Sequence, residues 1–203
     1  EGFLRNLMIK TSSIGEVMVL LSFHYGDDEA IRELMDAIMN AFSNITTLVY
    51  VINEKANDTF LDLPIEIYHG PGYIVEKLGD VKYRLGPKSF FQTNTKQAIR
   101  LYDLALEFAG LSPDNHVYDL YTGLGSIALY ASSHCKSIVG VENVAPAIDD
   151  AKANAEWNGI SNATFVVGNV EDVVDSDFIA AHGKPDVVIT DPPRAGMHER
   201  VID

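Results

Sequence analysis

The sequence predicts an α/β protein in two parts: a smaller α+β domain with an antiparallel sheet over residues 1–86, and a domain with a parallel sheet over residues 87–203. The hydrophobic pattern changes near residue 86, from short apolar segments around one helix to a regular alternation of apolar strands and helices. Such alternation is typical of parallel βαβ units. The chain has 203 residues, 47% of them apolar, which is enough for two small domains with hydrophobic cores.

Six short segments of the first part are rich in Val, Ile, Leu, Phe and Tyr and are expected to be strands. They are residues 3–10, 16–24, 46–52, 64–69, 73–78 and 81–85. Gly79-Asp80 separates the last two and favours a two-residue hairpin. Between the early strands, Asp27 or Asp28 can cap a helix whose apolar residues recur on one face. Those residues are Ile31, Leu34, Met35, Ile38 and Phe42.

After Pro87, the segment from Asn94 to Phe108 predicts a helix that ends at Gly110. Four strands are expected at Val117–Leu120, Ile138–Val141, Thr164–Val167 and Val187–Thr190, with helices between them at Ser126–Ser133, Pro146–Asn158 and Val170–Ala180. Ligands of such sheets bind where loops leave the carboxyl ends of the strands. Functional residues are therefore expected at 119–126, 142, 168–172 and 191–194.

The composition and the net charge disfavour several kinds of binding partner. Lys+Arg 15 against Asp+Glu 29 gives a formal net charge of −14 without an evident cluster of Lys and Arg, which disfavours tight binding of nucleic acid by this chain itself. No apolar run reaches the length of a membrane span, so no membrane partner is expected. The single cysteine, Cys135, cannot form an internal disulfide, which fits a reducing compartment, and we expect a cytoplasmic protein. The six histidines show no paired spacing, so no metal site is predicted.

The Gly-rich segment Asp119-Leu-Tyr-Thr-Gly123-Leu-Gly125-Ser126 follows a strand and opens a helix. Its glycines allow a tight turn against a ligand, but they also fit the dinucleotide fingerprint and do not select the cofactor by themselves. Asp119 favours S-adenosylmethionine over a dinucleotide, because a carboxylate at the strand end repels a diphosphate and attracts a sulfonium and an ammonium group. The alternative is that Asp119 only caps the loop by accepting from backbone amides.

Polar residues follow the next two strands as well. Glu142 lies 19 residues after Gly123 and can accept both ribose hydroxyls of a nucleoside, in either cofactor. A solvated glutamate at a strand end is the alternative. After the third strand, Asn169 or Asp172 can bond an adenine edge. Asn and Gly at such a position are, however, more often turn formers.

The fourth strand is followed by Asp191-Pro192-Pro193-Arg194. The prolines end the strand and leave Asp191 and neighbouring carbonyls facing the cleft, with a purely structural Pro-Pro turn as the alternative. Enzymes that methylate exocyclic amines carry an aromatic residue where this chain has Arg194, which indicates different chemistry. Between the domains lies the segment Ser89-Phe90-Phe91-Gln92-Thr93-Asn94. Its aromatic residues and Gln92 can cover a bound cofactor, and the alternative is that they only pack against each other and the domains.

In their order and spacing, four motifs resemble the RNA (uracil-5-)-methyltransferase family: Phe90-Phe91-Gln92-x-Asn94, Asp119-Leu-Tyr-x-Gly-x-Gly, Gly140-Val-Glu142 and Asp191-Pro-Pro-Arg-x-Gly196. Phe3-Leu-Arg-Asn-Leu-Met-Ile-Lys and Val51-Ile-Asn-x-x-x-Asn57-Asp also resemble that family's central domain. The similarity covers nearly the whole chain. The resemblance implies a central domain followed in the sequence by a Rossmann-like S-adenosylmethionine methyltransferase domain that is truncated at its carboxyl end. The implied reaction is methylation of carbon 5 of a uridine in ribosomal or transfer RNA.

Position by position, the resemblance places cofactor contacts on six residues, and with the loop residues Asp119, Gly123 and Gly125 they form the predicted cofactor site. The six are Gln92, Tyr121, Ser126, Glu142, Asn169 and Asp191. The family often has Asn where this chain has Ser126. Its chemistry adds a cysteine thiolate to carbon 6 of uracil and removes the carbon 5 proton with a glutamate. Both residues are expected beyond Asp203, so no catalytic residue is assigned here, and Cys135 is assigned to packing.

The resemblance also implies the strand order three, two, one, four, with a fifth strand beyond. The fourth strand would then be an apolar edge through which the chain can self-associate. Three alternatives remain open: a methyltransferase of the same fold acting on another RNA base or on a protein, a nicotinamide-dependent oxidoreductase, and a non-catalytic scaffold for RNA or another partner.

Overall fold

The computed structural model describes residues 2–194, 196–197 and 199–201. The chain divides into two compact units, one of Glu1–Lys77 with Arg84–Ser89 and one of Leu78–Tyr83 with Phe90–Asp203. The strands β5 (Ile74–Leu78) and β6 (Val81–Leu85) form a two-stranded sheet whose tip groups with the second unit. The hydroxyl of the fully buried Tyr83 donates there to the carbonyl of Ser126, at 2.9 Å.

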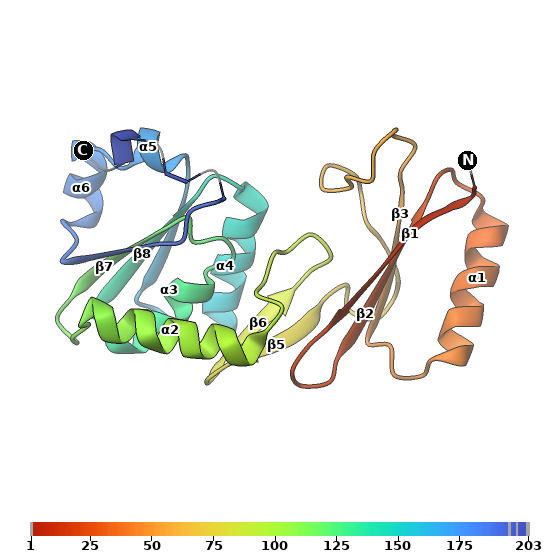
Figure 1. The fold of residues 1–203 in the computed structure, drawn as a ribbon, viewed down its shortest axis with the longest axis horizontal. Coiled ribbons are helices and arrows are strands. Elements are labelled where there is room, and N and C mark those ends of the chain that lie inside the picture. Colours follow the sequence, from red (N-terminus) through yellow and green to blue (C-terminus); the bar gives the residue numbers. More distant parts are fainter. Residues whose placement is uncertain (1, 195, 198, 202–203) are drawn as a thin grey trace. The chain divides into compact units, whose positions relative to one another are not determined.

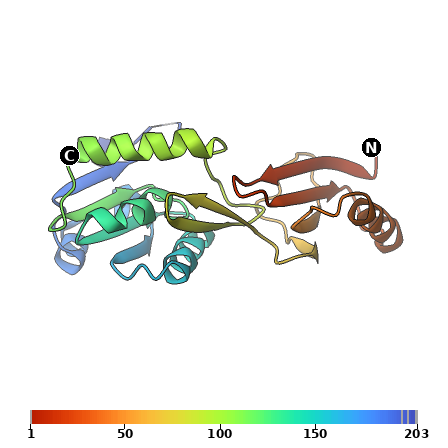
Figure 2. The ribbon, with the colours of Figure 1, turned by 90° about the horizontal axis from the view of Figure 1, so that it is seen from below.

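The first unit contains a four-stranded sheet and one helix in the order β1 (Leu4–Thr11), β2 (Val17–Phe23), α1 (Asp28–Ala41), β3 (Thr47–Ile52) and β4 (Glu66–His69). The pairs β1/β2 and β3/β4 are antiparallel, as expected, and Figure 2 shows β1 and β2 as neighbouring ribbons that run in opposite directions. The pair β2/β3 is parallel, which the sequence analysis did not anticipate. The reason is that α1 carries the chain back across the sheet between these two strands.

The central strand β2 is buried on both of its faces. One face packs against α1, which lies along the sheet in Figure 1 and begins at Asp27, whose side chain accepts from the amide of Ala30. This core contains Val19, Leu21, Phe23, Ile31, Met35, Ile45 and Leu48. The other face is covered by the loop between β3 and β4, in a smaller cluster of Leu20, Val49 and Val51 with Met8, Phe60, Leu63 and Ile65.

The second unit begins with α2 (Thr95–Ala109), which is capped by Asn94 and ends at Gly110 in the left-handed conformation, as predicted. It continues as β7 (His116–Leu120), α3 (Ser126–Ala131), β8 (Ser137–Glu142), α4 (Ala145–Trp157), β9 (Ala163–Val167), α5 (Val170–Val173), α6 (Ser176–His182) and β10 (Val187–Thr190). The four strands are parallel in the order β10-β7-β8-β9. This confirms the expected order of these four strands.

Alternate residues of β7 serve the two faces of this sheet. Tyr118 and Leu120 pack, with Val139 and Val141, against Val170 of α5 and Phe178 of α6. Asp119, between them, accepts a hydrogen bond from the backbone of α3. The helices α3 and α6 therefore cover opposite faces, as Figure 1 shows.

Two expected helices differ from the prediction. The helix expected at Val170–Ala180 is divided into α5 and α6, because Asp175 is extended and its side chain caps α6 by accepting from the amide of Phe178, at 2.8 Å. The helix expected at Ser126–Ser133 is α3 followed by a 3₁₀ turn at Ser132–His134. A second 3₁₀ turn occupies Glu199–Val201. Among the described residues, no helix combines the length and apolar character of a membrane span.

The strand β10 lies at one end of the four-stranded sheet, and Val188 on it is 49% exposed. A strand edge offers unpaired backbone donors and acceptors, and this one carries an exposed apolar side chain. For the isolated polypeptide of residues 1–203 we expect self-association through β10. Val188→Lys should shift its sedimentation profile towards the monomer, because a charge at an edge opposes pairing.

Ile179→Lys is the matched control, since Ile179 is 37% exposed but lies on α6. It should leave the sedimentation profile unchanged. A wild-type polypeptide that stays monomeric at high protein concentration would contradict the expectation.

Candidate cofactor site at the carboxyl edge of the parallel sheet

The four parallel strands end at one edge of their sheet. In the strand register, Leu120 of β7 lies opposite Val141 of β8 and Thr190 of β10, and Glu142 lies opposite Val167 of β9. The loops after all four strands therefore begin side by side. The segments that the sequence analysis selected at 119–126, 142, 168–172 and 191–194 begin at this edge.

The loop after β7 has a backbone that requires its glycines. Tyr121 has a φ of 67°, Gly123 of 57° and Gly125 of 81°, all in the left-handed region. A Cβ atom on Gly125 would also lie 3.0 Å from the ring of Phe165 and 3.2 Å from the Cβ of Ala151. Tyr121 is the one described non-glycine residue with such a φ, and this kind of local strain is concentrated at functional sites.

Asp119 is completely buried, and one of its oxygens holds the loop together. Its Oδ2 accepts from the hydroxyl of Thr122, at 2.5 Å, and from the amide of Ala128 in α3, at 3.0 Å. The capping role considered from the sequence is thus present. Its Oδ1 is buried and has no hydrogen-bond partner among the described residues. Burial raises the pKa of Asp119 to about 7, against the opposing effect of these two hydrogen bonds.

Glu142 ties the end of β8 to the glycine loop. Its Oε2 accepts from the amide of Gly123, at 3.1 Å, and its Oε1 from the amide of Val144, at 3.0 Å. The carboxylates of Glu142 and Asp191 also contribute to the raised pKa of Asp119. Acidic groups from three neighbouring strand ends therefore act on one another, and their combined field favours a cation at this edge.

Ser126 is the first residue of α3, and its hydroxyl forms a hydrogen bond with a tyrosine of another helix. The hydroxyls of Ser126 and Tyr102 lie 3.1 Å apart, and Tyr102 comes from the buried face of α2. Burial raises the pKa of Tyr102, and Asp191 and Asp119 raise it further. No signal in the sequence predicts this contact, because Tyr102 fits the apolar stripe of α2.

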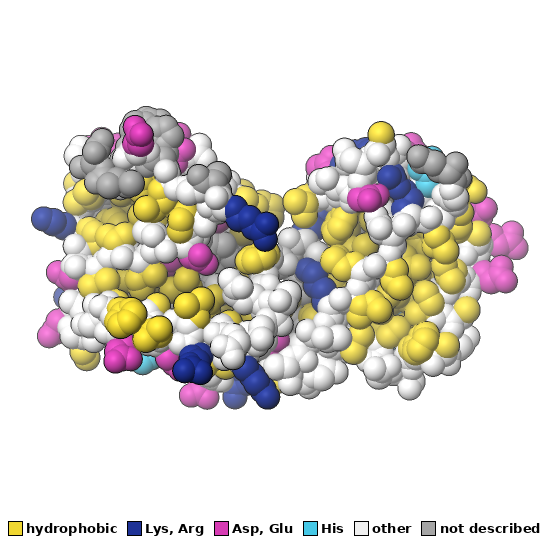
Figure 3. Space-filling view, in the orientation of Figure 1, with side chains coloured by type: hydrophobic (Ala, Val, Ile, Leu, Met, Phe, Trp, Pro, Cys, Tyr) yellow, Lys and Arg dark blue, Asp and Glu magenta, His cyan; other side chains and the backbone are white. Residues whose placement is uncertain are grey.

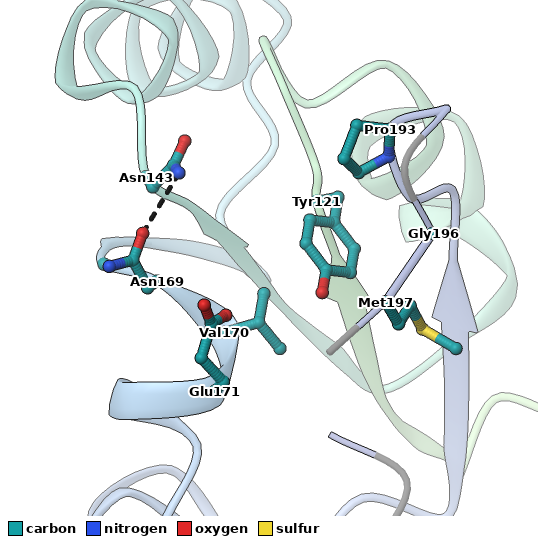
Figure 4. A pocket seen from close by; sticks show the side chains of 9 residues that line it. Tyr121, Asn143, Asn169, Val170, Glu171, Pro193, Gly196 and Met197 are labelled. Atoms are coloured by element: carbon teal, nitrogen blue, oxygen red, sulfur yellow. Dashed lines mark hydrogen bonds between the residues drawn. The ribbon is translucent and has the colours of Figure 1, made fainter. Parts of the chain in front are cut away.

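A pocket of about 390 Å³ opens among the loops after β7, β8, β9 and β10, within the size range of ligand sites. Figure 4 shows Asn143 and Asn169 on one side, joined by a hydrogen bond of 3.0 Å, and Tyr121 and Pro193 on the other. The lining residues are Tyr121, Asn143, Gly168, Asn169, Val170, Glu171, Pro193, Gly196 and Met197.

The predicted site residues lie in different surroundings. Tyr121 and Asn169 line the pocket, whereas Asp119, Gly123 and Glu142 take part in the hydrogen bonds that hold the glycine loop, and Ser126 is hydrogen-bonded to Tyr102. Gly125 begins α3, Asp191 follows β10 with its amide 3.4 Å from the carbonyl of Leu120, and Gln92 is half-buried in the loop before α2.

Two lining residues, Asn143 and Met197, are not among those predicted from the sequence. Asn143 directly follows Glu142, and a polar residue immediately after a strand end was the signal available for it. Met197 had none. The described part of the chain holds no group of three or more His, Cys, Asp or Glu side chains suited to bind a metal ion.

The sequence model of the family described as tRNA (Uracil-5-)-methyltransferase matches residues 6–203. The chain belongs to this family. A relative from Porphyromonas gingivalis, described as an uncharacterized RNA methyltransferase, is 52% identical over 204 residues, which cover 100% of this chain and 44% of the relative. One from Bacteroides thetaiotaomicron, with the same description, is 48% identical over 206 residues and is covered to 45%. The chain thus spans just under half the length of these family relatives.

Solved structures agree with the family assignment. The crystal structure of Pyrococcus abyssi tRNA (uracil-54, C5)-methyltransferase in complex with S-adenosyl-L-homocysteine is similar with a TM-score of 0.79 and 30% identity, covering 100% of this chain and 47% of that one. The Methanocaldococcus jannaschii tRNA m1G37 methyltransferase is similar with a TM-score of 0.56 and 15% identity, covering 95% of this chain and 55% of that one, a likeness of fold alone. The fold is therefore the Rossmann-like fold of these methyltransferases.

The raised pKa of Asp119 makes stability depend on pH. The carboxyl ionises near pH 4 in the unfolded chain and near pH 7 in the folded one, so between these values the folded state binds more protons and its stability falls as the pH rises. Asp119→Asn keeps an oxygen that can accept from Thr122 and Ala128 and has no charge to bury. Its free energy of unfolding, relative to wild type, should rise from pH 4 to pH 7 by up to about 4 kcal/mol and stay level above.

Urea unfolding across this pH range measures the difference. A difference between Asp119→Asn and wild type that is independent of pH would show that the buried carboxyl does not titrate in this range.

Proposed function

We propose that the protein containing this chain transfers a methyl group from S-adenosylmethionine to carbon 5 of a uridine in transfer or ribosomal RNA, and that residues 1–203 supply the cofactor site. The observation that carries the proposal is the convergence of Asp119, Glu142 and Asp191 beside a glycine loop and an open pocket. Family membership and the likeness to a C5-specific tRNA methyltransferase support the choice of reaction.

The residues present fit this cofactor. Among the described residues, Oδ1 of Asp119 is a buried acceptor that has no hydrogen-bond partner, and a cationic ligand would supply one. The pocket offers amide groups from Asn143 and Asn169 and the apolar side chain of Val170, a combination that suits a purine ring and its polar edge. When bound, S-adenosylmethionine supplies an electrophilic methyl group on a sulfonium.

Residues from the end of β8 and the loops after β7, β8 and β9 then bind and orient the ligand. Glu142, already held by the amides of Gly123 and Val144, is placed to accept from ribose hydroxyls. Asn169 faces the pocket, with its own orientation set by Asn143 and Asp172. The phenol ring of Tyr121 closes the side opposite Asn169 (Figure 4). Three acidic strand ends disfavour a diphosphate here, which weighs against a nicotinamide dinucleotide.

Carbon 5 of uracil needs activation by a nucleophile at carbon 6, and the chain's cysteine is unsuited to this task. Cys135 is 7% exposed, and burial raises the pKa of its thiol, whereas a nucleophilic cysteine needs a lowered one. It follows the 3₁₀ turn after α3, before β8, at the edge of the sheet away from the candidate site. We therefore propose that the nucleophilic cysteine and the glutamate base lie outside residues 1–203.

A test of the cofactor site is Glu142→Gln in the full-length protein. The amide cannot accept two hydrogen bonds with the strength of a carboxylate, so the affinity for S-adenosylhomocysteine should fall roughly tenfold to a hundredfold in calorimetric titration. Glu156→Gln, an exposed residue of α4, removes the same charge and should leave the affinity unchanged. Wild-type protein that binds NAD but not S-adenosylhomocysteine would refute the cofactor.

The target atom can be tested separately. Unmodified transfer and ribosomal RNA transcripts labelled with tritium at carbon 5 of uridine should release tritium to water when the full-length protein and S-adenosylmethionine are added, because methylation replaces that hydrogen. Methyl transfer without tritium release would identify another base or atom. Intact cofactor binding without transfer to any RNA would favour a scaffold.

A further inference from the structure

One stretch of the chain departs from its overall acidity. Residues 77–100 contain six of the 15 Lys and Arg residues and a single acidic residue, Asp80, so this stretch carries a net +5 in a chain of net −14. The six are Lys77, Lys82, Arg84, Lys88, Lys96 and Arg100. No cluster of Lys and Arg was expected in this chain, and the net charge of −14 conceals this local excess of cations.

Several of these cations have a structural role within the chain. Lys88 donates to the carbonyl of Leu63, at 2.6 Å, Lys82 lies 5.9 Å from the centre of the Trp157 ring, and Arg84 lies over the ring of Tyr73. Lys96 and Arg100 differ from them. Both are exposed on α2, and within the described chain neither has a hydrogen-bond or ionic partner.

The positions of these two cations are unfavourable for α2 itself. Lys96 lies in the first turn, which holds no acidic residue, so its charge opposes the positive end of the helix dipole. Arg100 follows at the i+4 position, where two like charges repel each other. Asp103, three residues after Arg100, partly offsets the repulsion at Arg100, but no acidic residue lies three or four positions from Lys96 on the described chain, and an external anion would offset the cost there.

The same helix contributes to the candidate cofactor site. Its buried face carries Ala98, Tyr102 and Leu106, and Tyr102 contacts Ser126 at the start of α3. The helical spacing puts Lys96 and Arg100 on the opposite side of α2, and Figure 3 shows Lys and Arg side chains gathered beside this helix. Gln92, a predicted cofactor residue, precedes Lys96 by four positions.

We propose that Lys96 and Arg100 form a contact surface for the phosphates of RNA, beside the cofactor site of the same unit. The inference rests on the proposed function, because RNA is chosen as the polyanion on the strength of that function. Two cations on one helix face, without a partner in the described chain, provide contacts to the RNA backbone that position RNA without reading its sequence. Such contacts let an acidic protein bind RNA, because they act at short range and its other charges are screened.

The test uses the full-length protein and fluorescence anisotropy with a labelled oligo-uridine RNA and with unmodified tRNA transcripts, over a series of salt concentrations. Lys96→Gln/Arg100→Gln should weaken binding of both RNAs alike. It should also reduce the slope of log affinity against log salt for the single strand by roughly 1.4, about 0.7 for each lost phosphate contact. In turnover, KM for RNA should rise and kcat should stay unchanged.

The matched control is Lys136→Gln/Lys184→Gln, which removes two exposed cations from the loops that precede β8 and β10, at the opposite edge of the sheet. It should leave the salt slope unchanged. A wild-type slope in the α2 variant, an equal loss in the control, or binding to anionic vesicles without binding to RNA would each overturn the proposal.

Failure of the proposed function has a different signature. If tritium release is absent while the salt slope of RNA binding falls only in the α2 variant, the surface stands and the reaction falls. If tritium release occurs and the α2 variant binds RNA as wild type does, the reaction stands and the surface falls.

Discussion

The site depends on two carboxylates that hold the loop between β7 and α3. Asp119 accepts from Thr122 and from the first turn of α3, and Glu142 accepts from Gly123 and Val144. Backbone amides at the start of a helix have no partner within it, so these acceptors fix the position of the turn. The left-handed backbone at Tyr121, Gly123 and Gly125 is maintained because both ends of the loop are tied in this way.

The same arrangement costs the fold some stability and favours a particular ligand. The buried carboxylate of Asp119, with one oxygen that has no partner in the described part of the chain, is more stable when protonated, and neighbouring carboxylates add to that preference. A cation at the strand ends would reverse the balance by stabilising the ionised form. The chain thus holds its acidic groups together against their mutual repulsion at the edge where the cofactor site is proposed.

Total charge describes this chain poorly, because its charges are unevenly distributed. The net value of −14 averages a cationic stretch at 77–100 with a remainder that is more acidic than the average. Electrostatic contacts with a polyanion act over about a Debye length, so the charges that matter are the local ones. The helix α2 combines a contact to the candidate cofactor site with two exposed cations. One of its sides contacts the loop at Ser126, and the other carries Lys96 and Arg100.

The sequence by itself determined most of the elements and the edge at which the candidate site lies, and the resemblance to the family implied the order of the four parallel strands. Signals such as Asn94 and Gly110 at the ends of α2 act through neighbouring residues, and family motifs cover the loops. Tertiary structure decided the parallel pairing of β2 with β3, the break at Asp175, the contact of Tyr102 with Ser126 and the place of Met197 in the pocket. Most of these depend on segments distant in sequence, and the break at Asp175 on a local cap that the continuing apolar pattern concealed.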